Sequence, residues 1–392
     1  MIVKRIELLI MLKGGKRMKK KRIAAVVLCA AMVLGLLSGC GSSSSSSSSA
    51  SKSSSASSKS TSTSTAKSDI VVGFSTGAAG TTFRQEGIDD FTKVAEEYKS
   101  EGRIKDYKIV NNTTNWDATE QAGIIRDFIN DDSINVIVVN PDSPTDLNGV
   151  LEEAVAAGKT VVAVDCEVDV EGVKCVSIDH YTWGQKVADY ICKSLDGTGN
   201  IIQVYGGEGH PANNQRIKAT DDVLKNYPNI KMLSSTSGGW DEETAKNVTS
   251  QILGSGQTID GVITQDSMGY GCLQAFVDLG QCPKAAFVEC GTANVKLAKQ
   301  LIDSGKDLKF CSQPNPPSIV ASGLRIAVNL AEGKTPKDGV LGGLYGRAFI
   351  YDVKAWYTEK DIDTMLTQFQ SKGDDYLYTE YWTEEEAEAF FQ

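Results

Sequence analysis

The chain has 392 residues, of which 41% are hydrophobic, 7% aromatic and 23% charged, and its formal net charge is −10. This length exceeds what one hydrophobic core usually serves, so two or three domains are expected. The acidic balance argues against nucleic acid as a ligand, because such ligands need a positively charged surface. With His180 and His210 as the only histidines, we expect neither a metal site nor a cofactor.

The first forty residues are typical of an export signal. A basic run over residues 19–22 precedes an apolar stretch over residues 23–37, which is short for a membrane-spanning helix. The stretch ends in Leu37-Ser38-Gly39-Cys40, which resembles the lipobox of bacterial lipoproteins. The resemblance implies that residues 1–39 are a signal peptide and that Cys40 carries lipid. An ordinary membrane anchor is the alternative, and translation could start at Met1 or Met18.

Residues 40–68 form the next segment, which is almost entirely serine after Cys40. Such a composition buries too little apolar area to offset the entropy lost on folding, so we expect a lipid-anchored, disordered tether. Removal of residues 1–39, with nine Lys/Arg and one acid, changes the net charge from −10 to −18. The lipobox resemblance implies that the protein lies outside the cytoplasm, lipid-anchored to the outer face of the cell membrane.

From Asp69 onward, apolar strand-like runs alternate with amphipathic stretches. The predicted strands are 70–75, 107–111, 135–140, 160–165, 173–178, 199–205, 230–235, 261–265, 284–290 and 308–312. Ser143-Pro144 predicts one helix start, and the acids after Trp240 predict another. About ten βα units favour two doubly wound parallel sheets over one. Seven cysteines in this part, an odd number without a CxxC spacing, are expected to be small core residues.

Polar side chains follow many of these strands, at the edge where α/β sheets bind ligands. They are Ser75, Asp165, His210, Trp240, Asp266, Glu289, Cys290, Gln313 and Asn315. Hydrogen-bonding groups together with a large aromatic ring suit a sugar, whose hydroxyls are polar and whose ring has an apolar face.

The block over residues 135–167, NVIVVNPDSPTDLNGVLEEAVAAGKTVVAVDCE, resembles the type I periplasmic binding proteins, in the branch of the ribose and galactose binders. The similarity covers residues 69–353. It implies an α/β fold of two lobes joined by a three-crossing hinge, with crossings near Asp179, Gln313 and Gly346. The lobes would be residues 69–179 plus 314–345 and residues 180–313 plus 346–392. The second would include an acidic, aromatic extension after Val353, which is expected to pack on it or to bind a partner.

The resemblance also implies site residues. Phe83 and Arg84 occupy the place of the family's first-loop motif, His210 with Arg216 resembles the galactose-binding pattern, and Cys166 replaces an arginine of ribose binders. Cys290 aligns with the family's late aspartate, so either it or Glu289 faces the cleft. The candidate ligand-binding residues are Ser75, Phe83, Arg84, Asp165, His210, Asn214, Arg216, Trp240, Asp266, Glu289 and Gln313.

The expected function is that of the solute-binding lipoprotein of an ABC importer. It would bind a small polar ligand, expected to be a mono- or small saccharide, and deliver it to a permease. The expected partners are the sugar, the permease and the membrane, without nucleic acid, and the protein is expected to be a monomer. A sensory receptor of the same fold is the first alternative. A sugar-processing enzyme is the second, although no P-loop, GxSxG or HExxH motif is complete.

Overall fold

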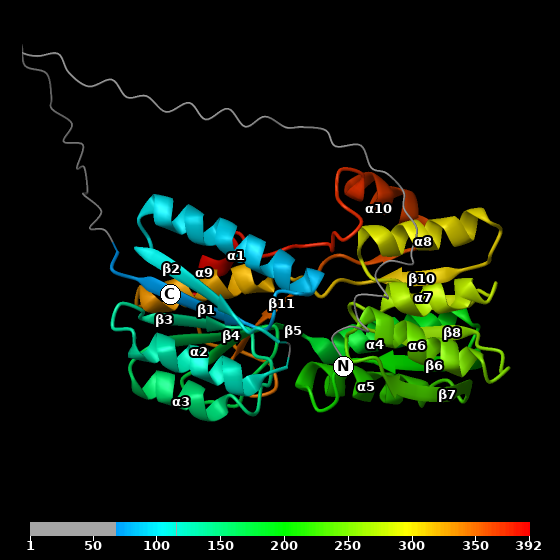
Figure 1. Cartoon of the computed structure of the whole chain (residues 1–392), viewed down its shortest axis with the longest axis horizontal. Helices are drawn as coiled ribbons and strands as arrows, with labels where there is room; N and C mark the ends of the chain where they lie inside the picture. The colour runs from blue at the N-terminus through cyan, green and yellow to red at the C-terminus, as the bar shows by residue number, and fades with distance from the viewer. Residues whose placement is uncertain (1–67, 115) are drawn as a thin grey trace, which may run out of the picture. The chain divides into compact units, whose positions relative to one another are not determined.

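The computed structural model describes residues 68–392, with the exception of Asn115. The predicted signal peptide, the lipid on Cys40 and the serine-rich tether therefore lie outside the described residues, apart from Ser68. The described chain forms two six-stranded sheets, each covered by helices on both faces (Figure 1). This arrangement confirms the prediction of two doubly wound α/β lobes.

The first lobe is built on a sheet with the strand order β11-β5-β4-β3-β1-β2. Helices α1 and α9 pack on one face, and α2 and α3 cover the other. Strands such as β3, whose four residues are all buried, are apolar throughout because both faces are covered. The elements are β1 (Val71–Thr76), α1 (Thr82–Glu101), β2 (Asp106–Asn111), α2 (Ala118–Asn130), β3 (Val136–Val139), α3 (Asn148–Ala156), β4 (Thr160–Val164), β5 (Lys174–Ile178), α9 (Ile319–Ala331), β11 (Ala348–Tyr351) and α11 (Glu384–Glu388).

The second lobe is built on a sheet with the order β12-β10-β9-β8-β6-β7. Its strands are parallel except β12, which pairs antiparallel with β10 at the edge. The elements are α4 (His180–Ser194), β6 (Thr198–Tyr205), α5 (Pro211–Leu224), β7 (Asn229–Ser237), α6 (Glu242–Leu253), β8 (Gly261–Thr264), α7 (Gly269–Asp278), β9 (Ala285–Phe287), α8 (Thr292–Asp303), β10 (Lys309–Ser312), β12 (Tyr357–Thr358), the 3₁₀ turn η2 (Glu359–Asp361) and α10 (Ile362–Phe369).

The connections between the lobes correct part of the predicted division. The chain crosses after β5 and again after β10. The third crossing does not fall near Gly346, because Ala348–Tyr351 forms β11 and pairs with β5 of the first lobe. The chain reaches the second lobe only at β12 and then returns, since Trp382 donates its backbone N–H to Ser322 Oγ of α9 at 3.0 Å. Residues 346–392 therefore divide between the lobes, and there are four crossings.

Of the two predicted helix starts, one agrees with the structure and the other does not. Acids fill the first turn of α6, as predicted, and Asp241 caps the helix by accepting from the backbone N–H of Thr244 at 2.7 Å. The helix predicted to start at Pro144 begins later, at Asn148. Ser143 Oγ does accept from the N–H of Asp146 at 3.2 Å. The N–H of Asn148, however, donates to the carbonyl of Thr145, three residues back, at 3.2 Å, so a turn precedes the helix.

The seven cysteines of the described chain are free thiols. Six of them are buried, which confirms their prediction as core residues, whereas Cys282 is only partly buried. Over the same residues, no helix is long and apolar enough to cross a membrane.

Candidate ligand-binding site

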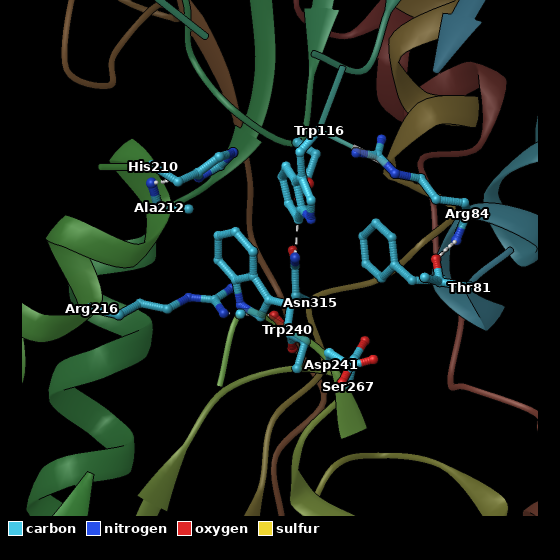
Figure 2. Close-up of a pocket in the computed structure, with 14 residues that line it drawn as sticks. Thr81, Arg84, Trp116, His210, Ala212, Arg216, Trp240, Asp241, Ser267 and Asn315 are labelled. Atoms are coloured by element: carbon cyan, nitrogen blue, oxygen red, sulfur yellow. Dashed lines mark hydrogen bonds and ion pairs between the residues drawn. The ribbon is translucent and has the colours of Figure 1, made fainter. Parts of the chain in front are cut away.

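A cavity of about 340 Å³ is lined by residues of both lobes. Most of them follow the carboxyl ends of strands, where α/β sheets bind ligands. Figure 2 shows Trp116 and Trp240 facing one another, with Arg84 and Arg216 approaching from opposite sides. The first lobe and the second crossing contribute Thr81, Phe83, Arg84, Trp116, Asp165 and Asn315. The second lobe contributes His210, Ala212, Arg216, Gly239, Trp240, Asp241, Asp266 and Ser267.

Trp240, in the turn between β7 and α6, is fixed by its surroundings. Its indole Nε1 donates to Gln265 Oε1 at 3.1 Å. Gly206, at the end of β6, passes so close beneath the ring that an added Cβ would overlap the indole. Only glycine therefore fits there, and the hydrogen bond and the close packing that hold the Trp240 ring both come from the second lobe.

Trp116, in the loop after β2, is held more loosely. Its side chain stacks on Trp240 with the ring centroids 5.7 Å apart and the planes at 27°. Half of the residue (50%) is exposed to solvent, and its backbone N–H donates to Asp142 Oδ2 at 3.1 Å. The loop is thus anchored by its backbone, while the side chain is held by ring contacts and remains half open to solvent.

Arg216, on α5, is buried in a network of its own lobe. Its Nη1 pairs with Asp266 Oδ2 at 2.6 Å, and its Nη2 lies 3.1 Å from His180 Nδ1. The guanidinium also lies over the Trp183 ring, 4.1 Å from the centroid. Ion pairing and cation–π contact together balance a charge whose side chain is only 2% exposed.

Arg84 lies in the first turn of α1, where a positive charge opposes the helix dipole. The conflict is resolved by Asp142, whose Oδ1 lies 3.1 Å from Arg84 Nη2, and by Thr76 Oγ1, which accepts from Nη1 at 2.9 Å. Asp142 also accepts from Asn112 Nδ2 at 2.7 Å. Burial raises the pKa of Asp142 above its usual value, while Arg84 opposes the rise. The Asp142 carboxylate therefore holds both Arg84 and the backbone of Trp116, which together form the first-lobe wall of the cavity.

Backbone strain is concentrated around the cavity. Five non-glycine residues of the described chain have a positive φ, and four of them line the cavity. They are Trp116 (64°), Asp165 (70°), Trp240 (56°) and Ser267 (60°), whereas Asp196 (51°) lies elsewhere. Left-handed backbone is unfavourable for such residues and persists where the surroundings impose it, which is typical of functional sites.

Asp165 and His210 supply further polar groups. The Asp165 carboxyl accepts from Asn315 Nδ2 at 3.1 Å, and burial raises its pKa. His210 caps α5, with Nδ1 accepting from the N–H of Ala212 at 3.3 Å, and its ring meets Trp240 edge-on. Burial and the charges of both arginines lower the pKa of His210 to about 3, so its ring is neutral at pH 7.

Seven of the predicted binding residues lie together in the lining: Phe83, Arg84, Asp165, His210, Arg216, Trp240 and Asp266.

The other four predicted residues are not among those that line the cavity. Ser75 is fully buried in β1, and its Oγ lies 3.3 Å from Gln121 Nε2. Asn214 Nδ2 donates to Gly209 O at 3.3 Å, which ties it to its own turn. Gln313 is buried at the second crossing. Ser75, Asn214 and Gln313 therefore do not line the cavity directly, contrary to the prediction.

Either Glu289 or Cys290 was expected to face the cleft, but both are buried and neither lines the cavity. Glu289 Oε1 accepts from the N–H of Ser267 at 2.8 Å, so it supports the lining from behind. Burial, and secondly the charge of Asp266, raise the pKa of Glu289 to about 8.

Sequence reasoning missed Trp116, Asp241 and Ser267. A single tryptophan within the polar segment NNTTNWD after β2 was the one available signal, since a large ring in a loop has no core to fill. Nothing in the sequence marks Asp241 beyond its role as a cap. Within the described part of the chain, no cluster of three or more His, Cys, Asp or Glu side chains is arranged to hold a metal ion.

Residues 72–335 match the family described as periplasmic binding protein domain. The chain belongs to this family. The match spans most of both lobes and the first two crossings, and it confirms the resemblance seen in the sequence.

Characterised members of the periplasmic binding protein family are related to this chain at moderate identity. The xylitol-binding protein of Mycolicibacterium smegmatis is 27% identical over 256 residues, which is 64% of this chain and 69% of the relative. The D-apiose import binding protein of Paraburkholderia graminis is 28% identical over 162 residues, 41% of this chain and 52% of the relative. The chain thus aligns with about half of the apiose relative's length.

The fold agrees with solved structures of the family. An ABC transporter solute binding protein from Thermobispora bispora superposes with a TM-score of 0.70 at 26% identity, over 82% of this chain and 94% of that one. The relatives are solute-binding proteins rather than enzymes, and the family is extracytoplasmic.

Proposed function

We propose that the protein is the solute-binding lipoprotein of an ABC importer and that it binds a small neutral sugar or polyol in the cavity between its lobes. The observation that carries the proposal is the lining itself, in which two tryptophans from different lobes face one another among charged hydrogen-bonding groups. Flat aromatic faces suit the apolar side of a sugar ring, and the polar groups suit its hydroxyls.

The charge balance of the lining supports a neutral ligand. Arg84 is paired with Asp142, and Arg216 is paired with Asp266, so neither guanidinium needs an anion from the ligand. Both remain hydrogen-bond donors, and the Asp165 carboxyl adds an acceptor. A phosphorylated or carboxylated ligand would meet the further acidic groups of Asp165 and Asp241, which also line the cavity.

Ligand contacts from both lobes supply the mechanism. A solute that touches Arg84 and Asp165 on one side and Arg216 and Trp240 on the other favours the conformation in which these walls are close. A ligand that touched one lobe alone could not shift that equilibrium. The lobes would close about the crossings, and the closed form would dock on the permease.

The anchoring part of the proposal rests on the sequence. The lipobox-like Leu37-Ser38-Gly39-Cys40 and the serine-rich segment after it support a lipid on Cys40 and a flexible tether on the outer face of the membrane. Metabolic labelling with an alkyne fatty acid should mark the wild-type chain and not a Cys40→Ala variant, which should also leave the membrane fraction. Equal labelling of both would contradict this assignment.

A thermal-shift screen of the purified full chain in detergent tests the ligand class. The panel should hold pentoses, hexoses, inositols, polyols and furanose sugars, because a ligand that binds only the folded state raises the melting temperature. The best ligand is then titrated by calorimetry and followed for chemical change. Saturable binding without turnover is expected, whereas turnover would indicate an enzyme and a flat screen would contradict the proposal.

Transport is tested in the native cell. Deletion of the gene should abolish uptake of the radiolabelled ligand, and expression of the wild-type chain should restore it. Unchanged uptake with a lost transcriptional response to the ligand would instead support a sensory receptor of this fold.

A further inference from the structure

His180 lies where the two lobes meet, although sequence reasoning gave it no role in binding. It is the first residue of α4, directly after the first crossing, and its residue is only 2% exposed. Its Nε2 lies 3.1 Å from the backbone carbonyl of Asp165, at the end of β4 in the first lobe. Its Nδ1 lies 3.1 Å from Nη2 of Arg216, on α5 of the second lobe. One ring thus contacts a cavity-lining residue of each lobe.

The partners of the ring define its protonation. A guanidinium can only donate, so Nδ1 must accept from Arg216. A carbonyl can only accept, so Nε2 must carry the proton that it donates to Asp165. Burial, and secondly the charge of Arg216, lower the pKa of His180 well below its usual value, so the neutral ring is maintained. A protonated ring would lose the acceptor on Nδ1 and face the guanidinium with a like charge.

Asp165 and Arg216 both depend on their contact with the His180 ring. Asp165 has a positive φ of 70°, a conformation that its surroundings must impose, and its carbonyl also accepts from Ser177 Oγ at 3.0 Å. Arg216 is almost fully buried, and Asp266 satisfies only one end of its guanidinium. The ring therefore fixes the backbone that aims the Asp165 carboxyl and the other end of the Arg216 fork.

The packing of α4 against α5 is arranged to bring these groups together. Gly184, one turn after His180, lies directly over α5, where an added Cβ would stand 2.9 Å from the Cα of Arg216. A larger residue would push α5 away and lengthen the contact between Arg216 and His180. The close approach of α4 and α5 at Gly184 thus keeps Arg216 within reach of His180.

We propose that His180 is a positioning residue for the ligand site, which aligns Asp165 of the first lobe with Arg216 of the second so that both reach the same solute. The inference rests on the proposed function, because it assigns a role in binding. It adds a residue that acts through two others and touches no ligand itself.

Three substitutions separate the two contacts. His180→Leu removes both. His180→Asn retains an acceptor at the place of Nδ1 for Arg216, and His180→Gln retains a donor near the place of Nε2 for Asp165. His180→Leu should weaken binding of the sugar found in the screen by about ten- to one-hundredfold, the range expected when a hydrogen bond to a buried charge is lost. Asn and Gln should each restore part of the affinity.

Asn329 provides a matched control, because it makes the same two kinds of contact far from the cavity. It is buried in α9, donates to the backbone carbonyl of Arg325 at 2.8 Å and accepts from Lys334 Nζ at 2.5 Å. Asn329→Leu should lower the melting temperature much as His180→Leu does and leave the affinity unchanged. Equal losses of affinity in both variants, or wild-type affinity in His180→Leu, would overturn the inference.

A spectroscopic readout needs no ligand. The chain has two histidines, so ¹⁵N-histidine NMR gives two ring systems, and the loss of one in His180→Gln assigns them. His180 should show the neutral tautomer with the proton on Nε2 from pH 5 to pH 8, among the nearby groups Arg216, His210 and Asp165. A titrating ring, or a proton on Nδ1, would overturn the positioning role even if the sugar binds. A wild-type chain that binds no solute would instead remove the proposed function, and the role in binding with it.

Discussion

The two walls of the cavity are held in different ways. In the second lobe, Arg216 has 2% of its side chain exposed and three partners, and Trp240 is hydrogen-bonded and packed over Gly206. In the first lobe, Arg84 is 11% exposed and depends on Asp142 and Thr76, and Trp116 is half exposed. The side chains of the second-lobe wall are therefore already fixed before a ligand binds, whereas those of the first-lobe wall can still adjust.

The spacing of the tryptophans shows which wall must adjust. Their ring centroids are 5.7 Å apart, but a sugar ring between them would need about 7 Å, which is two van der Waals contacts of about 3.5 Å. Trp240 cannot retreat, because Gly206 lies against it. Trp116 must then move outward to admit a ring, and the ligand sets its final position. The preorganised second-lobe wall lowers the entropic cost of binding. The adaptable first-lobe wall makes room for the ligand.

The arginines should give the largest contrast. Arg216→Ala leaves the buried Asp266 carboxylate without its partner, so the free energy of unfolding should fall by about 3–5 kcal/mol and sugar binding should be lost. Arg84→Ala leaves Asp142 bonded to Asn112, so stability should fall by about 1 kcal/mol and affinity about tenfold. Urea unfolding and calorimetric titration measure both. Equal losses of stability in the two variants would contradict the difference between the walls.

The tryptophans should give the next effect. Trp240→Ala removes a fixed ring and leaves the Oε1 of Gln265 without its donor, so it should reduce both the free energy of unfolding and that of binding by about 2 kcal/mol. Trp116→Ala should reduce the free energy of binding by about 1 kcal/mol and leave stability unchanged, because the ring is exposed. Trp116→Phe, which retains an aromatic face, is the control and should bind almost normally. A large loss of stability in Trp116→Ala would show that the first wall is also rigid.

Much of this fold is visible in the sequence, because buried parallel strands are continuous apolar runs. The run AFIY over Ala348–Tyr351 is of the same kind, yet the expected crossing at Gly346 placed it in the wrong lobe. A four-residue strand at a sheet edge carries no signal of which sheet it joins. The pairing with β5 depends on contacts between residues about 170 positions apart, which a local pattern does not encode.

The site was partly predictable for a related reason. The ends of strands indicate which segments face the cavity, but successive side chains point to opposite faces, so the rule selected Ser75 and Glu289 as well as Asp165 and Asp266. Trp116 follows a polar loop of irregular length, and its position depends on the bond from its backbone to Asp142.

The buried carboxyl behind the second wall should make stability depend on pH. The pKa of Glu289 is raised from 4.5 to about 8 in the folded protein, so the folded state keeps a proton that the unfolded chain releases. Its contribution is complete below about pH 4.5 and is lost as the pH rises toward 8. Between pH 6 and pH 7 the free energy of unfolding should fall by about 1 kcal/mol from this group. Glu289→Gln, which cannot ionise, should flatten that part of the curve, and an unchanged slope would show that Glu289 is already charged.

The smallest effect is expected at Asp142, the anchor of the first wall. Asp142→Asn retains an oxygen for Asn112 or for the Trp116 backbone but loses the charge that holds Arg84. The affinity should fall about threefold and the free energy of unfolding by about 1 kcal/mol. In an Arg84→Ala background the same change should have almost no further effect on affinity, because the partner is already absent. Asp106→Asn, which removes an exposed ion pair with Lys99, is the matched control and should leave affinity unchanged. An affinity loss at Asp142 that persists without Arg84 would mean that the carboxylate acts through the Trp116 loop, and the adaptable wall would then be positioned by its backbone alone.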